Sequence, residues 1–221
     1  MTRQEVMDRL RALGTESGRK VNAKLGAQAD QFGVKMGDLR AIAKEIKSDP
    51  DLAEELWASG NLEAMMIAIL IIKPNSLSTE ELDRMTSQIP SPQVADWFST
   101  NIAKNHPLKE SRREAWMSSE HVMTRRLGWS LTTERVAKSP EGLDLSALLD
   151  RLETEMGAAP RDAQWTMNFC LIEIGVNSPE HRDRAIRIGE KIGAFRDYPT
   201  SKGCTTPYAP ICIPELVKRQ V

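Results

Sequence analysis

The chain of 221 residues has few of the residues that mark extracellular, metal-binding or redox proteins. Its three cysteines, Cys170, Cys204 and Cys212, form no C-x-x-C pair, so neither a disulfide framework nor a four-cysteine zinc site is indicated. The three histidines are scattered and form no H-E-x-x-H motif. We therefore expect no metal and no organic cofactor.

Long hydrophobic segments are also missing. The longest apolar run covers residues 64–72 and stops at Lys73-Pro74, well short of the roughly 20 residues that span a bilayer. The N-terminus has no apolar stretch of signal-peptide length. The sequence thus predicts a soluble, cytoplasmic protein with reduced cysteines and no membrane partner.

Overall charge favours no partner, because 30 Lys and Arg residues face 31 Asp and Glu residues. The distribution of charge is more informative. Residues 50–83 hold seven acidic residues and one basic residue, whereas residues 101–139 hold eight basic and four acidic residues. A neutral chain with one basic segment suits an anionic polymer that touches a single surface. The solvated faces of ordinary helices give the same pattern, and that alternative stays open.

Helix signals recur from one end of the chain to the other, and no convincing β-strand pattern is present. Thr2-x-x-Glu5 is a capping box, and Asp49-Pro50 is an N-cap followed by proline in the first turn. Caps and apolar spacing predict helices over residues 2–13, 38–47, 49–59, 61–73, 78–89, 119–138, 144–156, 160–174 and 179–192, with two more that begin at 91 and 107. Residues 14–33 are expected to be irregular.

Short helices joined by tight turns, paired in units of roughly 30–45 residues, are typical of a helical repeat protein. The predicted fold class is all-α, an α-α superhelix of HEAT-like repeats with about 11–13 helices. Because the repeat is one of pattern and not of residue identity, a closed helical bundle is the structural alternative. The predicted domains are a repeat domain over 1–193 and a tail over 194–221.

The tail departs from the helical pattern. Between residues 197 and 214 it contains four prolines, together with a glycine and several polar residues. Proline lacks a backbone N–H and breaks helices, so this segment is not expected to form one continuous helix. Its aromatic and aliphatic residues favour an irregular but ordered tail that packs on the last repeat.

The most informative constellation lies near the middle of the chain. Trp97 and Asn101 are four residues apart on a predicted helix, which places the indole and the carboxamide on one face. A later helix carries the dibasic pair Arg125-Arg126. An aromatic ring, a neutral polar group and a guanidinium are suited to gripping a nucleotide. Tryptophans on amphipathic helices are also common core residues, and dibasic pairs occur on many solvated faces.

Three stretches resemble a known family: Phe32-Gly33-Val34, Leu39-Arg40-x-Ile42-Ala43-Lys44 and the helices of Trp97 and Arg126. The chain is similar, over roughly residues 20–190, to the DNA alkylation repair proteins built from HEAT-like repeats, the AlkD-like family. The resemblance implies a DNA-binding protein that recognises or excises alkylated purines in duplex DNA.

Glycosylases of that family carry two aromatic residues, an aspartate and an arginine on a concave surface. The resemblance places the first aromatic at Trp97, the arginine at Arg126 and the second aromatic at Phe169. The aspartate position is occupied by Asn101. Further candidate DNA contacts are Arg125 and three basic residues that would meet phosphates: Lys104, Arg112 and Arg113.

The missing acid leaves the catalytic residue unknown. Release of an alkylated purine passes through a sugar with oxocarbenium character, which a nearby carboxylate stabilises. Asn101 is neutral, and the loss of one such electrostatic group costs about 10²–10³ in rate. Asp96 points away from the face of Trp97 and Asn101 on an ideal helix. Carboxylates on other helices, such as Glu134 and Glu173, are a further option.

Two alternatives to this interpretation remain. The chain is a non-catalytic helical-repeat scaffold whose concave face binds a protein or peptide, or it excises an unfamiliar lesion with a carboxylate outside the family position. An acidic concave surface would favour the scaffold, and release of bases from alkylated duplex would favour excision.

Overall fold

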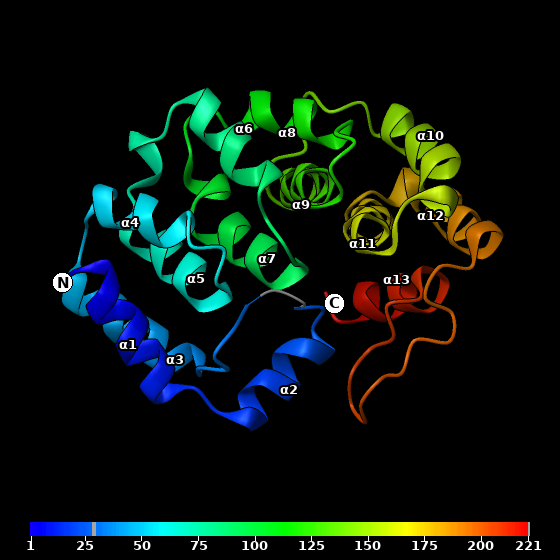
Figure 1. Cartoon of the computed structure of the whole chain (residues 1–221). Coiled ribbons are helices and arrows are strands. Elements are labelled where there is room, and N and C mark those ends of the chain that lie inside the picture. Colours follow the sequence, from blue (N-terminus) through cyan, green and yellow to red (C-terminus); the bar gives the residue numbers. More distant parts are fainter. Residues whose placement is uncertain (28–29, 221) are drawn as a thin grey trace. The chain divides into compact units, whose positions relative to one another are not determined.

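The computed structural model describes residues 1–27 and 30–220. Within those residues it contains thirteen α-helices, three short 3₁₀ helices and no β-strand (Figure 1), which confirms the all-α prediction. The chain divides into two compact units, Met1–Ser111 and Arg112–Val221. The predicted boundary at residue 193 is a different division of the chain and stays a prediction.

The first unit is built around α5 (Leu62–Ile71), whose residues are buried except for Leu70. This helix contacts α1 (Arg3–Leu13), α3 (Met36–Ile46), α4 (Pro50–Trp57) and α7 (Pro92–Asn101). A helix that is apolar on every side belongs in the centre of a helical array, as the sequence predicts. The unit also contains α2 (Glu16–Lys24), η1 (Pro74–Ser76), α6 (Thr79–Ser87), η2 (Ala103–Asn105) and the start of α8 (Lys109–Met117).

A buried carboxylate at the start of α5 organises the preceding loop. Glu63 is 1% exposed, and its carboxylate accepts backbone N–H bonds from Phe32 at 2.9 Å, from Gly33 at 2.7 Å and from Val34 at 3.1 Å. The side chain of Asn22 in α2 donates a further bond at 3.3 Å. A buried charge is stable only when hydrogen bonds replace the water it has lost, and four donors do so here.

The same loop approaches α2 closely at two glycines. Gly33 has a φ of 80°, and a Cβ there would lie 2.3 Å from the carbonyl oxygen of Thr15. A Cβ on Gly18 would lie 2.0 Å from the carbonyl oxygen of Gly33. Only glycine fits at such contacts. The Phe32-Gly33-Val34 motif therefore lies between α2 and the start of α5 and contacts both.

Helix α2 lies in the stretch that the sequence predicts to be irregular, so that prediction was wrong for residues 16–24. Thr15 is its N-cap and accepts a bond from the N–H of Gly18 at 3.0 Å. The helix buries one residue, the polar Asn22, so it has no apolar stripe that sequence periodicity could detect.

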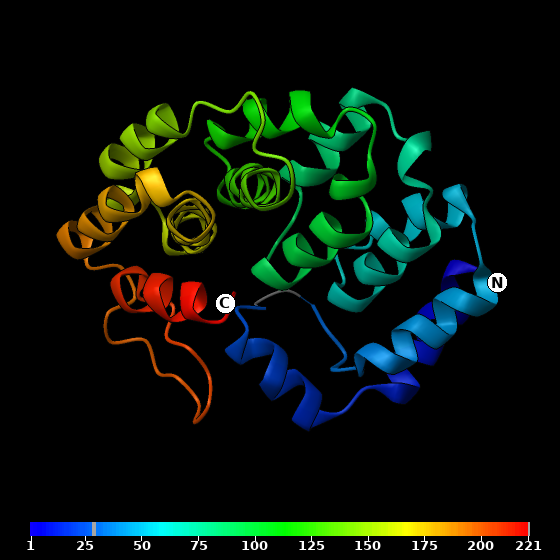
Figure 2. The same ribbon diagram turned by 180° about the vertical axis from the view of Figure 1, so that it is seen from behind.

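The second unit contains α9 (Val122–Lys138), α10 (Leu145–Glu155), η3 (Met156–Ala158), α11 (Arg161–Asn177), α12 (Pro179–Ile192) and α13 (Ala209–Lys218). Helices α9 and α11 lie side by side in both views (Figure 1, Figure 2). Its core gathers Trp129 from α9, Leu149 from α10, Leu171 from α11 and Ile213 from α13.

Helix α13 begins within the segment whose prolines argued against one continuous helix. Pro210 stands in its first turn, where a missing N–H has no cost, and Pro214 lies inside it. The helix contacts both α11 and α12. Proline content alone therefore overestimated the length of the irregular segment, which is limited to the stretch between the end of α12 and the start of α13.

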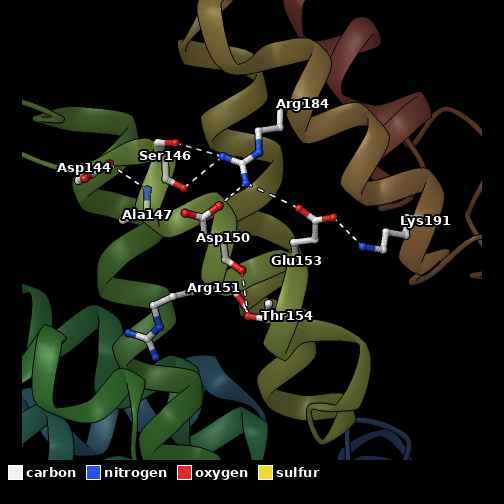
Figure 3. A network of polar contacts seen from close by, with 9 residues as sticks. All are labelled: Asp144, Ser146, Ala147, Asp150, Arg151, Glu153, Thr154, Arg184 and Lys191. Carbon is white, nitrogen blue, oxygen red and sulfur yellow. Dashed lines mark hydrogen bonds and ion pairs between the residues drawn. The ribbon is translucent and has the colours of Figure 1, made fainter.

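Ion pairs join α10 to α12 at an exposed edge (Figure 3). The guanidinium of Arg184 binds the carboxylate of Asp150 and donates to Ser146 Oγ at 3.1 Å, while Lys191 Nζ lies 2.6 Å from Glu153. The Lys191 ammonium lowers the pKa of the Glu153 carboxyl, and Asp150 raises the pKa of Arg184. Because carboxylates already compensate these two cations, this edge is a poor contact for an anionic polymer.

Replacing Glu63 by glutamine tests the organising role of the carboxylate. Glutamine keeps the size but removes the charge and turns an N–H₂ group toward other donors, so Glu63→Gln is expected to lower the free energy of unfolding by about 3 kcal/mol. Urea unfolding followed by circular dichroism measures the loss. Glu55→Gln, at an exposed position on α4, is the matched control, with an expected change below about 0.5 kcal/mol. Equal stability of both variants would contradict the role assigned to Glu63.

Candidate nucleic-acid interface

The first group of candidate residues gathers around the indole of Trp97 on α7. The half-buried ring donates from Nε1 to the carbonyl oxygen of Met66 in α5 at 3.1 Å. The guanidinium carbon of Arg40, on α3, lies 4.8 Å from the centre of the ring. The hydrogen bond fixes the edge of the indole, and the cation lies over one face of it. Three helices thus place an exposed arginine beside a tryptophan of fixed orientation.

Asn101 is the last residue of α7, one turn after Trp97 on the same face. Its Nδ2 donates to the carbonyl oxygen of Trp97 at 2.8 Å, and Asn105 Nδ2 donates to the carbonyl oxygen of Asn101 at 3.3 Å. The Asn105 carboxamide thus satisfies a carbonyl group at the end of α7 that has no partner within the helix, and the Asn101 carboxamide adds a side-chain bond one turn back. An ionised aspartate at 101 could not donate to the Trp97 carbonyl, so the amide has a structural role here that a carboxylate lacks.

Lys104 follows in the short helix η2. The buried ring of His106 fixes this turn. Its Nε2 lies 3.0 Å from the Leu77 carbonyl oxygen, and its Nδ1 accepts the Leu108 N–H at 3.0 Å. Lys104 itself is half-buried, and its carbonyl oxygen accepts a bond from Lys109 Nζ at 3.3 Å. Lys104 therefore lies in a fixed turn, three residues after Asn101 in the chain.

The second group lies in the second unit. Arg126, on α9, is 5% exposed, and its Nη1 donates to the carbonyl oxygen of Asp162 in the first turn of α11 at 2.8 Å. Arg125 is half-buried, and its Nε donates to the carbonyl oxygen of Ser119 at 2.7 Å. Arg126 is therefore largely engaged with protein, and Arg125 is the more exposed of the pair.

Helix α9 begins at Val122, and its N-cap is His121 where the sequence suggested Ser119. The ring Nδ1 of His121 accepts the Thr124 N–H at 3.3 Å. Burial lowers the pKa of His121, which favours the neutral ring that such an acceptor requires. The cap sets the start of the helix that carries both arginines.

Arg113 is 5% exposed, and its guanidinium lies 3.0 Å from Glu114 Oε1 and 3.4 Å from Thr132 Oγ1. This burial does not favour a direct contact with phosphate. Its neighbour Arg112 is half-buried. Phe169, on α11, is half-buried, packs against the core of the second unit and lies 5.0 Å from the ring of Trp165.

The structure thus brings Trp97 and Asn101 together and adds Arg40, which the sequence did not single out as a site residue. Arg40 belongs to one of the stretches that carry the family resemblance, and it lies on the exposed side of α3, away from the buried Leu39 and Ile42. Those two signals could have identified it. Arg126 binds α11 at Asp162, about two helical turns before Phe169.

The other carboxylates that the sequence offers as acids have partners. Glu134 binds Lys138 Nζ at 2.7 Å, and Glu173 accepts a bond from Asn177 Nδ2 at 2.8 Å. Asp96 is exposed on α7, next to Trp97. Among residues 1–27 and 30–220 there is no group of three His, Cys, Asp or Glu residues that could hold a metal. No helix in the same ranges is long and apolar enough to cross a membrane.

Comparison with known proteins assigns the family. The model of the DNA alkylation repair enzyme family matches residues 6–211, which is most of the chain, so the chain belongs to the DNA alkylation repair family. The resemblance that the sequence motifs indicated is therefore confirmed.

Two proteins from Listeria match over a similar part of the chain. "Uncharacterized protein Lin0241" of Listeria innocua is 24% identical over 184 residues, which are 81% of this chain and 80% of that protein. "Uncharacterized protein Lmo0209" of Listeria monocytogenes is 22% identical over 184 residues, with the same two shares.

One solved structure resembles the whole chain, with a TM-score of 0.80 and 25% identity, and covers 100% of this chain and 95% of that one. It comes from a family of proteins related to the HEAT-like repeat DNA glycosylases with affinity for branched DNA structures. The likeness confirms the prediction of a HEAT-like repeat fold.

The three thiols differ in their surroundings, which gives a direct test of the second unit. Burial raises the pKa of the Cys170 thiol to about 12 and also raises that of Cys212, whereas Cys204 is exposed. At pH 8 we expect a thiol reagent to label Cys204 rapidly and the other two only after unfolding. Cys204→Ser should remove the fast phase, and Cys212→Ser should retain it. A second fast thiol in the native protein would contradict this arrangement.

Proposed function

We propose that this protein binds DNA, and that it prefers branched or distorted duplexes to regular ones. Two findings support the proposal. The chain belongs to the DNA alkylation repair family, and the solved structure that it resembles comes from proteins with affinity for branched DNA structures. The observation that carries it is the pairing of the exposed Arg40 with the half-buried ring of Trp97.

That pairing has the chemistry of a nucleotide contact. The Arg40 guanidinium can donate two parallel hydrogen bonds to a phosphate while it stays over the indole. The carboxamide of Asn101 can meet a sugar or phosphate without adding charge, and Lys104 adds a second cation nearby in the chain. Arg125 and Phe169 are proposed as contacts from the second unit, with Arg126 as the residue that positions the start of α11.

Removal of the Arg40 guanidinium tests this surface. Arg40→Ala is expected to weaken binding to a four-way junction about tenfold at low salt, and to reduce the dependence of binding on salt. Fluorescence anisotropy at several salt concentrations measures both effects. Arg11→Ala is the matched control, because Arg11 also lies over a ring, that of Phe32, but is compensated by Asp8 at 2.7 Å. If the wild-type protein binds neither junction nor duplex at low salt, DNA binding is excluded and the protein-scaffold alternative gains.

Excision of alkylated purines is the second candidate, supported by the family. Alkylation makes the base a good leaving group, so a surface that holds the sugar and stabilises its developing positive charge would be sufficient. Asn101 contributes no charge, and its amide is engaged with the Trp97 carbonyl. We therefore expect excision by the wild-type protein to be slow.

Restoring the acid gives a specific test of excision. Asn101→Asp is expected to increase the release of bases from alkylated duplex by about 10²-fold, at a cost of about 1 kcal/mol in stability from the lost bond to Trp97. Chromatography of the released bases measures the gain. Asn105→Asp is the control, because it makes the same chemical change one turn later, where Asn105 donates to the carbonyl oxygens of Thr100 and Asn101. No gain in a folded Asn101→Asp variant would argue against excision at this position.

A further inference from the structure

A second aromatic surface lies entirely within the second unit and involves the segment that follows α12. The centre of the Trp165 ring, on α11, lies 5.0 Å from the ring centre of Phe169, 5.2 Å from that of Phe195 and 5.3 Å from that of Tyr198. The guanidinium carbon of Arg161, one turn before Trp165, lies 4.7 Å from the centre of the Phe195 ring. We call these five residues the Trp165 cluster.

The backbone after α12 is shaped to build this cluster. Phe195 has a φ of 60°, in the left-handed region that non-glycine residues rarely occupy, and it directly follows Gly193 and Ala194. The N–H of Tyr198 then donates to the carbonyl oxygen of Phe195 at 3.1 Å, which closes a tight turn. Phe195 is 5% exposed and anchors the turn, so that Tyr198 meets Trp165. Strained backbone of this kind is worth a functional explanation.

Packing explains Phe195, but it explains the outer members of the cluster less well. Tyr198 is 38% exposed, Arg161 is exposed, and Trp165 is half-buried. Trp57, Trp116 and Trp129 are at most 3% exposed, as ordinary core tryptophans are. In the part of the chain that the structure describes, no acceptor binds the indole N–H of Trp165, whereas that of Trp97 binds Met66. The cluster therefore presents ring surface, a free indole donor and a cation to the solvent.

Flat rings beside a guanidinium have the chemistry that holds an unpaired nucleobase. Stacking on aromatic rings tolerates every base, because each base has a π-face, and an adjacent arginine can bind the phosphate of the same nucleotide. A base within a regular duplex is already stacked and cannot use such a surface. Branched or damaged DNA offers unpaired or weakly stacked bases.

We propose that the Trp165 cluster binds an unpaired nucleobase, with Tyr198 and Trp165 as the stacking surface and Arg161 as the phosphate contact. The proposal rests on the DNA-binding function proposed above and adds the feature of the DNA that is recognised. It assigns the segment after α12 a direct part in binding, through Tyr198.

The test compares three fluorescent DNA probes of one sequence: a fully paired duplex, the same duplex with one unpaired adenine, and the single strand. The wild-type protein is expected to bind the duplex with the unpaired adenine about tenfold more tightly than the paired duplex. Tyr198→Ala should remove most of this preference, whereas Tyr198→Phe, which keeps the ring, should retain it. Replacing the unpaired adenine by 2-aminopurine gives a second readout, because its fluorescence is expected to fall when it stacks on the wild-type cluster.

Arg161→Ala should weaken binding to the probe with the unpaired base about tenfold. Arg196→Ala is its control, because Arg196 is also exposed but its guanidinium carbon lies 5.5 Å from the centre of the Tyr208 ring, outside the cluster. Circular dichroism establishes that each variant is folded. Tyr198 and Arg161 are exposed, so these changes should leave the fold intact, whereas truncation of Trp165 would remove a ring contact of the buried Phe195.

The outcomes separate this proposal from the broader one. Equal binding of the paired and unpaired duplexes by the wild-type protein, or a preference that a folded Tyr198→Ala variant retains, would overturn the base-stacking role and leave DNA binding intact. Binding of the single strand without any binding of duplex or junction would support the cluster and contradict duplex recognition. If none of the three probes binds but the four-way junction does, only the base-stacking proposal fails; if the junction does not bind either, both proposals fail.

Discussion

The first unit depends on the buried carboxylate of Glu63. One charged group in the first turn of α5 receives three consecutive backbone N–H groups, from Phe32, Gly33 and Val34, and thereby holds a loop that no regular structure supports. The positive end of the α5 dipole adds to its stability there. Helix α2 is bound to this loop at Gly18 and Gly33, where no side chain fits. Without the carboxylate, three backbone donors, two of them buried, would lose their acceptor.

Burial distinguishes the arginines that resemble one another in the sequence. Arg113 and Arg126 are each 5% exposed and bind groups of the second unit, so their charge stabilises the contacts between helices. Arg40 and Arg161 are exposed and lie over aromatic rings. A guanidinium that is only partly desolvated by a ring keeps its donors for a ligand. The proposed contacts with DNA follow from this difference.

Most helices could be predicted because capping residues and prolines close to their ends determine where they begin and end. Asp49-Pro50, Ser78-x-x-Glu81 and Pro179 each begin a helix where the sequence predicts one. Helix α2 was missed because it buries a single polar residue, and α13 because proline in the first turn of a helix is harmless. The spacing of four residues on a helix identified Trp97 and Asn101 as neighbours. Arg40 is 57 positions away in the chain from Trp97, and no local rule joins them.

The sequence by itself determined the helical class, the repeat-like spacing and the family, because caps, prolines and apolar periodicity act over a few residues and family motifs are local. Only the tertiary structure decided which charges are buried and which rings meet. The exposure of Arg40, the burial of Arg126 and the meeting of Trp165 with Tyr198 depend on how helices pack, and packing energies sum over contacts between residues far apart in the chain.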